Sequence, residues 1–350
     1  MSPVLGKPDH RVMETITRLT GAKLKLVLQG PASGVDNSIL NIDGDRVLIA
    51  STDPISFIPR IGPQASGRLS VQAIASDVAT SGFAPKFALF ELNLPPSMRD
   101  ETLIQYWKSI HQTCRKFGIS IIGGHTGRFE GCDYTVVGGG TMLAIGSSEK
   151  YVTTGMAHSR DDLILTKSAA IEAAAVLASS FPKTVSQKLG GDVLDKTQRL
   201  IDITSTVKDA TTAASAGLRH RGVTAMHDVT EGGVVSAILD LATASRLKAT
   251  VEEESIPVFD EVRQVCELFH LDPLKSLGQG CLVIASRPGR TDAILRRLRR
   301  SKIPSRLVGT LGKKTGHSMI RKGNRESRMT YPVADPYWNV YWKAIRNKLR

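Results

Sequence analysis

The chain has 350 residues, which is more than a single hydrophobic core usually serves, so we expect two domains. Apolar residues make up 41% and charged residues 23%, a balance typical of a globular protein in water. No apolar run approaches the roughly 20 residues that a transmembrane helix needs, so a membrane span is excluded.

The amino-terminal segment and the cysteines favour a reducing compartment. MSPVLGKPDHRV has no apolar core, which argues against a secretory signal. No CxxC pair occurs, so neither a zinc knuckle nor a disulfide framework is expected. We therefore expect a cytoplasmic protein. The four scattered cysteines are Cys114, Cys132, Cys266 and Cys281.

The net charge of +13 is concentrated at one end of the chain. Residues 286–350 carry 18 Lys and Arg against three acids, a net +15, whereas residues 1–285 carry −2. Such a segment can bind nucleic acid, an anionic surface or a phosphate-rich ligand, but it is more often a solvated face. No RNP or zinc-finger motif accompanies the charge, so we expect the solvated face and keep nucleic acid as the less favoured alternative.

The first half of the chain alternates strands and helices. The Asp-Gly pair in NIDGD predicts a hairpin turn, Asp100 can cap a helix, and Gly82 and Gly118 are placed to end helices. The segment 118–124 has the composition of a buried strand that runs into glycines. The expected strands are 46–51, 87–92, 118–124 and 135–146, and the expected helices are 68–82 and 100–117.

After a seam near 147–161 the pattern begins again, and residues 181–200 are expected to form a polar loop. Both halves contain βα units, so the predicted class is α+β with α/β-type units in two domains. The predicted boundaries are 1–150 and 155–312, followed by a basic tail over 313–350. The expected strands are 162–167, 223–229, 248–253, 281–286 and 305–311, and the helices are 169–180, 206–219, 234–245, 258–269 and 290–301.

The last 16 residues are predicted to form a separate amphipathic helix. Asp335 is placed to cap it and Pro336 lies in its first turn. We expect the apolar face to dock onto the body of the protein or onto a partner subunit. Flanking cations keep a membrane-surface helix open as the alternative. The apolar face comprises Trp338, Tyr341, Trp342, Ile345 and Leu349, and the cations are Lys343, Arg346, Lys348 and Arg350.

Three acids in the first half are candidate metal ligands. Asp36 lies in SGVDNS before the first hairpin, Asp53 lies in STDPIS just past a predicted strand, and Asp77 lies on a predicted helix among small and apolar neighbours. Any one of them alone would be interpreted as a helix cap or a solvated acid. A buried Asp77, however, needs a partner, and a metal ion is one way to satisfy it. Mg²⁺ prefers carboxylate and phosphate oxygens.

Glycines in GGHTG suggest a place for an anion. After the strand 118–124, Gly123, Gly124, His125 and Thr126 would let backbone N–H groups approach a phosphate closely. There is no GxxxxGK[ST] loop and no GxGxxG at the start of a helix. Together with the three acids, these residues indicate a Mg-ATP site of a non-Walker type.

The stretch AMHDVTEGGV, residues 225–234, supports two interpretations. In the first it is only a helix start, with Thr230 as the cap, Glu231 favoured by the helix dipole and two glycines for close packing. In the second, His227, Asp228 and Glu231 are catalytic groups at the end of a strand. There Asp228 orients His227, which acts as acid, base or phosphate ligand. Zinc fits poorly because no third ligand is evident.

Seven segments make the chain resemble the PurM-like superfamily, which includes aminoimidazole ribonucleotide (AIR) synthase, the hydrogenase maturation factor HypE, thiamine-monophosphate kinase and selenophosphate synthetase. The similarity covers roughly residues 20–312 and is closest to the HypE branch. The most specific segments are the last two. In chain order the segments are GVDNSIL, LIASTDPISF, ASDVATSGFAPKF, GISIIGGHTG, TKSAAIEAAAVLA, MHDVTEGG and IPVFDEVRQVCELFHLDPL.

The resemblance implies a homodimer that pairs through the N-terminal domains, with ATP bound between the N- and C-terminal domains. Members use ATP to phosphorylate an oxygen, often of an amide or formyl group, which is then displaced. The resemblance implies that Asp36, Asp53 and Asp77 hold Mg²⁺ and the phosphates. It also implies that the GGxT element, here Gly123, Gly124 and Thr126, binds the nucleotide.

The chain departs from HypE at three points. His125 stands where HypE has an acid and Gly127 where it has a lysine, and Gln279 replaces the glutamate of its NEGK element. The HypE tail ends in the cysteine that carries the carbamoyl group, whereas this sequence ends in RNKLR and its last cysteine is Cys281. We therefore do not expect thiocarboxamide dehydration as HypE performs it.

Two functions follow from these observations. The first is an ATP-dependent enzyme that phosphorylates an amide-type or other oxygen of an unknown small-molecule or protein acceptor. The second is a non-catalytic nucleotide-binding scaffold or maturation-accessory protein, whose basic end and aromatic tail hold a partner.

Overall fold

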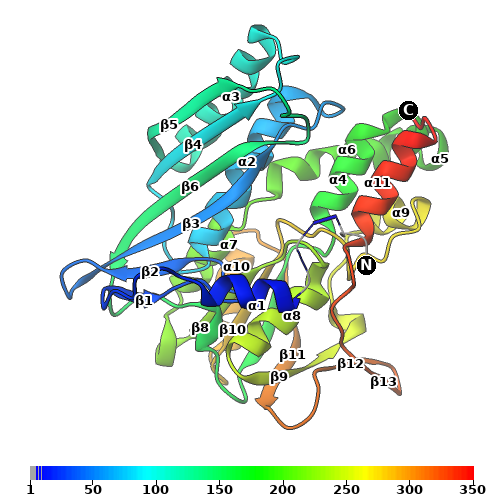
Figure 1. Ribbon diagram of the computed structural model, residues 1–350. Helices are drawn as coiled ribbons and strands as arrows, with labels where there is room; N and C mark the ends of the chain where they lie inside the picture. The colour runs from blue at the N-terminus through cyan, green and yellow to red at the C-terminus, as the bar shows by residue number, and fades with distance from the viewer. Residues whose placement is uncertain (1–4, 7, 9) are drawn as a thin grey trace.

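The computed structural model describes residues 5, 6, 8 and 10–350, and Figure 1 shows the arrangement of its elements. The N-terminal segment MSPVLGKPDHRV, from which we expect no secretory signal, lies partly outside the described residues. In the described part of the chain, no helix is long and apolar enough to cross a membrane. A short helix, α1 (His10–Arg18), precedes the first sheet.

The N-terminal half is a six-stranded sheet with two helices on one face. The strand order is β1-β2-β3-β6-β4-β5, antiparallel except for the parallel pair β4–β5. The expected hairpin joins β2 and β3, which pair in register through Ile39 and Ile49. The elements are β1 (Val27–Gln29), β2 (Ser38–Asn41), β3 (Arg46–Ser56), α2 (Gly62–Ala79), β4 (Phe87–Leu94), α3 (Asp100–Phe117), β5 (Ser120–Arg128) and β6 (Val136–Ser147).

The residues of helix α2 are mostly small or apolar and are buried on nearly every side of the helix, so α2 lies between other elements. A helix without a polar face is stable only when it is buried all round. It packs on β3, β6 and α3 in the N-terminal half and on α7 and β8 in the C-terminal half. Two bonds join it to the second half: Ser76 Oγ accepts from Thr206 N at 2.9 Å, and Thr204 Oγ1 donates to Gln72 Oε1. Helix α2 therefore couples the two halves.

No element formed by the described residues covers the opposite face of the first sheet (Figure 1). Side chains alternate along β6, with Met142 and Ala144 buried toward α2 and Ile145 46% exposed on the outer face. Val136, in the same strand, is 55% exposed. Both are apolar side chains that a single chain leaves exposed to water.

The C-terminal half is a seven-stranded sheet in the order β13-β12-β9-β11-β7-β10-β8. Its pairs are antiparallel except for β12–β9. Strands β7, β8 and β10 are buried along almost their whole length, and their residues Ile164, Met226 and Ile284 pack in one hydrophobic cluster with the first half. The strands are β7 (Asp162–Thr166), β8 (Val223–Asp228), β9 (Leu247–Glu252), β10 (Leu282–Ser286), β11 (Ser305–Lys313), β12 (Met319–Lys322) and β13 (Arg325–Arg328).

Helices of this half form two groups. One packs near the sheet, and the other forms a layer beside the first half that includes the C-terminal helix (Figure 1). The helices are α4 (Ile171–Ser180), α5 (Pro182–Leu189), α6 (Gly191–Arg199), α7 (Val207–Ala214), α8 (Gly233–Ala244), α9 (Asp260–Leu268), α10 (Thr291–Arg300) and α11 (Pro336–Arg346), with 3₁₀ turns at Thr154–Met156, Leu200–Ile203, Arg219–Arg221 and Glu253–Ser255.

The C-terminal helix α11 docks onto the body of the protein. Asp335 caps it as expected, since its side chain accepts the Tyr337 N–H. Tyr337 and Tyr341 are buried, and the Tyr341 ring lies 5.9 Å from that of Phe181, which lies between α4 and α5. The apolar face of this helix is therefore covered by the protein itself. This confirms the docked arrangement and leaves the membrane-surface alternative without support.

The structure corrects four sequence expectations. Residues 181–200 form α5 and α6 rather than a loop, because Val185 and Thr197 anchor these polar helices in the helical layer. Strand β3 continues to Ser56, so Asp53 lies within it and not past its end. Strand β5 is mostly exposed rather than buried, because it is the edge strand of its sheet. The short elements α1, β1, β12 and β13 were not expected.

Candidate active site where the two halves meet

The candidate site is built by residues from both halves. Asp36 precedes β2 of the first sheet, whereas His227 and Asp228 end the buried strand β8 of the second. One ligand atom from each of these three residues lies within 4.8 Å of the other two. Asp36 and His227 are nearly two hundred residues apart in the sequence, and the packing of α2 against β8 brings them together.

His227 is held by two carboxylates. Its Nδ1 lies 2.5 Å from Asp36 Oδ1, and its Nε2 lies 3.6 Å from Asp240 Oδ2 on α8. Burial lowers the pKa of His227, but Asp36 and Asp240 outweigh this effect and raise the pKa to about 10. The two carboxylates therefore favour the protonated form of the ring. Asp36 and Asp240 orient it, whereas the sequence analysis assigned that role to Asp228.

Asp77 faces the same group from α2. Ser51 Oγ on β3 lies 3.0 Å from Asp77 Oδ2 and 2.8 Å from the Asp36 carbonyl oxygen. Asn37 Nδ2 donates to the Asp77 carbonyl oxygen at 2.8 Å. These bonds tie the segment before β2 to the C-terminal end of α2, and so place Asp36 beside Asp77.

The carboxylates raise one another's pKa. Burial raises the pKa of Asp77 well above its ordinary value, and the charges of Asp228, Asp53 and Asp36 raise it further. Several acids that must share one partly dry site favour a bound cation, which relieves their repulsion. The charges of Asp36 and Asp53 thus act on Asp77, whereas the cluster of possible ligand atoms within 4.8 Å of one another consists of Asp36, His227 and Asp228.

The residues present fit a divalent metal ion. Asp36 Oδ2 is buried and accepts no hydrogen bond among the described residues, and an orphaned buried carboxylate oxygen is a costly feature that a cation would satisfy. Carboxylate oxygens are the ligands that Mg²⁺ prefers. Asp228 joins the candidate ligands as well as the predicted catalytic residues, because it is one of the three clustered groups.

Glu172, in the first turn of α4, is a site residue that the sequence analysis missed. Its Oε2 is buried without a hydrogen bond in the described structure. Burial raises the pKa of Glu172 to about 8, and the charges of Asp53, Asp335 and Glu231 add to the shift. The motif TKSAAIEAAAVLA contains it, but a glutamate near a helix start is usually a dipole partner, so no local signal distinguishes it.

The loop of residues 230–233 explains the two glycines of the motif. Helix α8 is capped by Gly232 at φ 79°, not by Thr230 as the helix-start interpretation assumed. A Cβ on Gly233 would lie 2.7 Å from the Leu274 carbonyl oxygen, so only glycine fits. Glu231 Oε1 accepts from Trp338 Nε1 at 3.2 Å rather than serving the dipole of α8 alone.

The segment 278–281 packs beneath this loop. Gly278 N donates to the Thr230 carbonyl oxygen at 3.3 Å, and Val229 N donates to the Cys281 carbonyl oxygen at 3.0 Å. Gln279 is buried beside them. Burial raises the pKa of the Cys281 thiol to about 12, so Cys281 is a neutral packing residue at physiological pH.

The GGHT residues lie apart from the carboxylates within one chain. Gly123, Gly124, His125 and Thr126 are inside β5, not in a turn after it, and β5 is three strands from β3. At the usual strand spacing this is roughly 14 Å. A Cβ on Gly124 would lie 1.9 Å from the Phe90 carbonyl oxygen, so this glycine is required by the pairing of β4 with β5.

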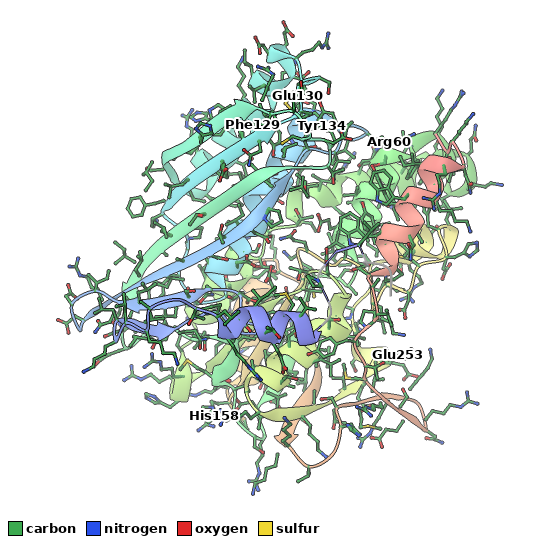
Figure 2. All side chains as sticks on the ribbon, in the orientation of Figure 1. Arg60, Phe129, Glu130, Tyr134, His158 and Glu253 are labelled. Carbon is green, nitrogen blue, oxygen red and sulfur yellow. The ribbon has the colours of Figure 1, made fainter. Side chains whose placement is uncertain are left out.

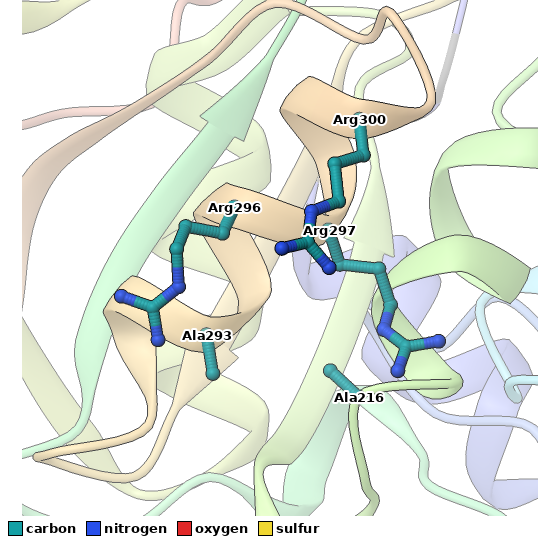
Figure 3. A pocket seen from close by; sticks show the side chains of 5 residues that line it. All are labelled: Ala216, Ala293, Arg296, Arg297 and Arg300. Atoms are coloured by element: carbon teal, nitrogen blue, oxygen red, sulfur yellow. The ribbon is translucent and has the colours of Figure 1, made fainter.

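A separate groove lies on the basic surface of the C-terminal half. Its volume is about 220 Å³, and Figure 3 shows three arginine side chains projecting from α10 around it. Arg297 Nη1 donates to Ser215 Oγ at 3.2 Å. No carboxylate of the described residues forms an ion pair with the three arginines. The lining residues are Ala216, Ala293, Arg296, Arg297 and Arg300.

Comparison with known proteins gives the family. The sequence model of the AIR synthase related protein, N-terminal domain, matches residues 34–145, and that of the C-terminal domain matches residues 161–322. The chain belongs to the AIR synthase-related family. Its two halves therefore correspond to the paired domains of that family, and the PurM-like, α+β architecture expected from the sequence is confirmed.

Members of the AIR synthase-related family with similar sequences or structures include hydrogenase maturation proteins. The carbamoyl dehydratase HypE of Escherichia coli strain K12 is 27% identical over 95% of both chains. The crystal structure of E. coli HypE gives a TM-score of 0.70, with 25% identity over 83% of this chain and 87% of that one. A HypE structure in complex with ATP gives a TM-score of 0.64 at 18% identity, over 96% and 98% of the chains, which shows a shared fold.

Proposed function

We propose that this protein is an ATP-dependent enzyme of the AIR synthase-related family that transfers the γ-phosphoryl group of ATP to an oxygen of an acceptor. The observation that carries the proposal is the meeting of Asp36 and Asp77 from the first half with His227 and Asp228 from the second. A HypE relative binds ATP, which supports the nucleotide assignment. The acceptor oxygen would be of the amide type, as in carbamoyl dehydratase, or another kind.

Mg²⁺ would be held by Asp36, Asp53 and Asp77, with Asp228 as a further ligand. When bound, it neutralises phosphate charge and orients the phosphates. The chain's own part is to bring the carboxylates together and to exclude water from them, since Asp36 and Asp228 have almost no exposed side-chain surface. Phosphoryl transfer depends mainly on such positioning and on charge neutralisation.

His227 would act as a cation and hydrogen-bond donor toward phosphate oxygens. Its contacts with Asp36 and Asp240, which raise its pKa, favour the protonated ring, so we assign His227 the role of a hydrogen-bond donor and not that of a general base. The acceptor oxygen would attack the γ-phosphorus as the bond to the bridging oxygen breaks, leaving the electron pair on ADP. Glu231 lies at the edge of the same site, held by Trp338.

The reaction would differ from the thiol-based reaction of HypE. Burial raises the pKa of the thiols of Cys114, Cys266 and Cys281 to about 12, so none of these three is a ready nucleophile. We propose that the acceptor is a separate small molecule or protein.

We propose further that the enzyme is a homodimer. The outer face of the first sheet exposes Val136 and Ile145, and Ile122 at the edge strand is 54% exposed. A second copy on this face would cover apolar surface that one chain leaves in water. It would also bring a second set of Gly123–Thr126 residues toward a site that lies three strands from the set of its own chain.

The test is titration of the full chain with Mg-ATP by calorimetry. We expect saturable binding that requires Mg²⁺, and at least tenfold weaker binding by Asp77→Asn, because a neutral amide oxygen binds the cation more weakly than a carboxylate does. Asp45→Asn is the matched control: Asp45 is exposed in the β2–β3 turn, and this change should leave the affinity unaltered. Absence of binding at millimolar Mg-ATP, or equal affinities of wild type and Asp77→Asn, would contradict the proposal.

A second candidate function is a nucleotide-binding scaffold whose basic end holds a partner. The arginine groove on α10 favours it, because Arg296 and Arg300 can form paired hydrogen bonds to phosphate. ATP binding without ADP release, together with salt-dependent binding of a 20-nucleotide RNA that Arg296→Gln and Arg300→Gln weaken, would favour this function. Binding unaffected by these changes would remove nucleic acid as the partner.

A further inference from the structure

The segment between β13 and α11 crosses the loop of residues 230–233. Gly232 N donates to Asp335 Oδ2 at 2.8 Å, and Trp338 Nε1 donates to Glu231 Oε1 at 3.2 Å. A Cβ on Gly232 would lie 3.3 Å from Pro332 Cγ, so the Pro332 ring packs close to the loop at Gly232. We call residues 331–338 the C-terminal strap.

The strap also contacts Asp240, one of the two carboxylates that hold His227. Tyr331 OH lies 2.9 Å from Asp240 Oδ1, and the other oxygen of Asp240 lies 3.6 Å from His227 Nε2. One side chain of α8 therefore stands between the strap and the buried histidine. The strap contacts the motif directly at Glu231 and Gly232. It reaches His227 only indirectly, through Asp240.

Helix α11 anchors the strap at its far end, across both halves of the molecule. The rings of Tyr337 and Tyr341 are buried in the helical layer. Arg60, which follows β3 of the first half, lies over the ring of Phe181 at 5.0 Å, and its Nη1 donates to the Leu349 carbonyl oxygen at 3.3 Å. Figure 2 shows Arg60 on the side of the molecule where α11 lies.

Helix capping alone does not account for these contacts. The N-cap of α11 uses Asp335 Oδ1, which accepts from Tyr337 N at 2.8 Å. The other oxygen, Oδ2, serves the loop, and the Trp338 indole would need no acidic partner merely to pack in the helical layer. Because both extra bonds end on adjacent residues of the motif, they restrain the loop rather than the helix.

We propose that Asp335 and Trp338 of the strap are positioning residues of the active site: they hold Glu231 and the Gly232 amide in place, and thereby act on phosphoryl transfer through the loop. The C-terminal strap is in this sense part of the site and not an appendage. The effect on catalysis depends on the proposed function, whereas the effect on the loop does not.

The first experiment measures amide hydrogen exchange of residues 228–236 in the full chain. Trp338→Phe keeps an aromatic ring but removes the N–H, and Asp335→Asn leaves one acceptor oxygen for two amides. We expect exchange to quicken at least tenfold in both variants. The matched control is Trp342→Phe, also in the helical layer on α11, whose indole forms no hydrogen bond to the loop in the part of the chain that the structure describes. Exchange in Trp338→Phe no faster than in this control would overturn the proposal.

The second experiment is a double-mutant cycle on ADP release from Mg-ATP. If Trp338 acts through Glu231, Trp338→Phe should lower kcat about five- to tenfold with little change in KM for ATP, and should lower it no further in a Glu231→Gln background. Additive losses, or a loss matched by Trp342→Phe, would count against positioning. A wild type that neither binds nor hydrolyses ATP would refute the proposed function, and hydrogen exchange would still decide whether the strap holds the loop.

Discussion

At the scale of single residues, burial decides which acids belong to the candidate active site. Asp36, Asp53 and Asp77 could be selected from the sequence because each stands beside a strand or on an apolar helix. Glu172 could not, since its burial depends on the helical layer and on the C-terminal strap, both distant along the chain. Likewise the partners of His227 are Asp36 and Asp240, not the adjacent Asp228.

Glu172 leads to a pH-dependent prediction. Its folded pKa is raised from 4.5 to about 8, so the folded protein keeps a proton that the unfolded chain releases, and stability falls as pH rises between these two values. Glu172→Gln, a neutral mimic, should raise the free energy of unfolding at pH 8 by on the order of 3 kcal/mol and change it little near pH 4. Urea unfolding without divalent ions at several pH values measures this, and a pH-independent difference between the two proteins would contradict it.

At the scale of elements, periodicity predicted the long helices and strands well. The helix over 100–117 ends at Gly118 with φ 69°, as the sequence indicated. The helices of 181–200 were missed because their sequence is polar and their stability comes from packing on neighbouring helices. The prediction that β5 is a buried strand was also wrong, because no local pattern distinguishes an edge strand from a central one.

The glycines of β6 provide a prediction at this scale. Gly138 has φ 141°, and a Cβ there would lie 1.8 Å from the Glu91 carbonyl oxygen on β4, whereas at Gly139 the nearest atom would be 3.7 Å away. Gly138→Ala should therefore destabilise the protein by about 3 kcal/mol or more, and Gly139→Ala by about 1 kcal/mol or less. Thermal unfolding of the two variants side by side checks this. Similar losses would show that β4 and β6 are not so closely paired.

At the scale of the whole molecule, the uncovered sheet face leads to a prediction about assembly. If two copies pair through it, light scattering after gel filtration should give twice the mass of the chain. Ile145→Asp on this face should shift the protein to monomer, because a buried charge without a partner is costly. Val333→Asp is the control, since Val333 is 93% exposed away from the sheet. A wild-type monomer, or a dimer that persists in Ile145→Asp, would contradict pairing through this face.

The sequence by itself determined the two-domain α+β class, the acids near strands and the glycine-rich motif, because these depend on local periodicity and residue chemistry. Only the tertiary structure decided which of them meet. Asp36 and His227 are brought together by α2 packed between the two halves, and the C-terminal segment, expected as a separate tail, bonds to the 230–233 loop. Such contacts depend on the packing of distant elements, which no local pattern encodes.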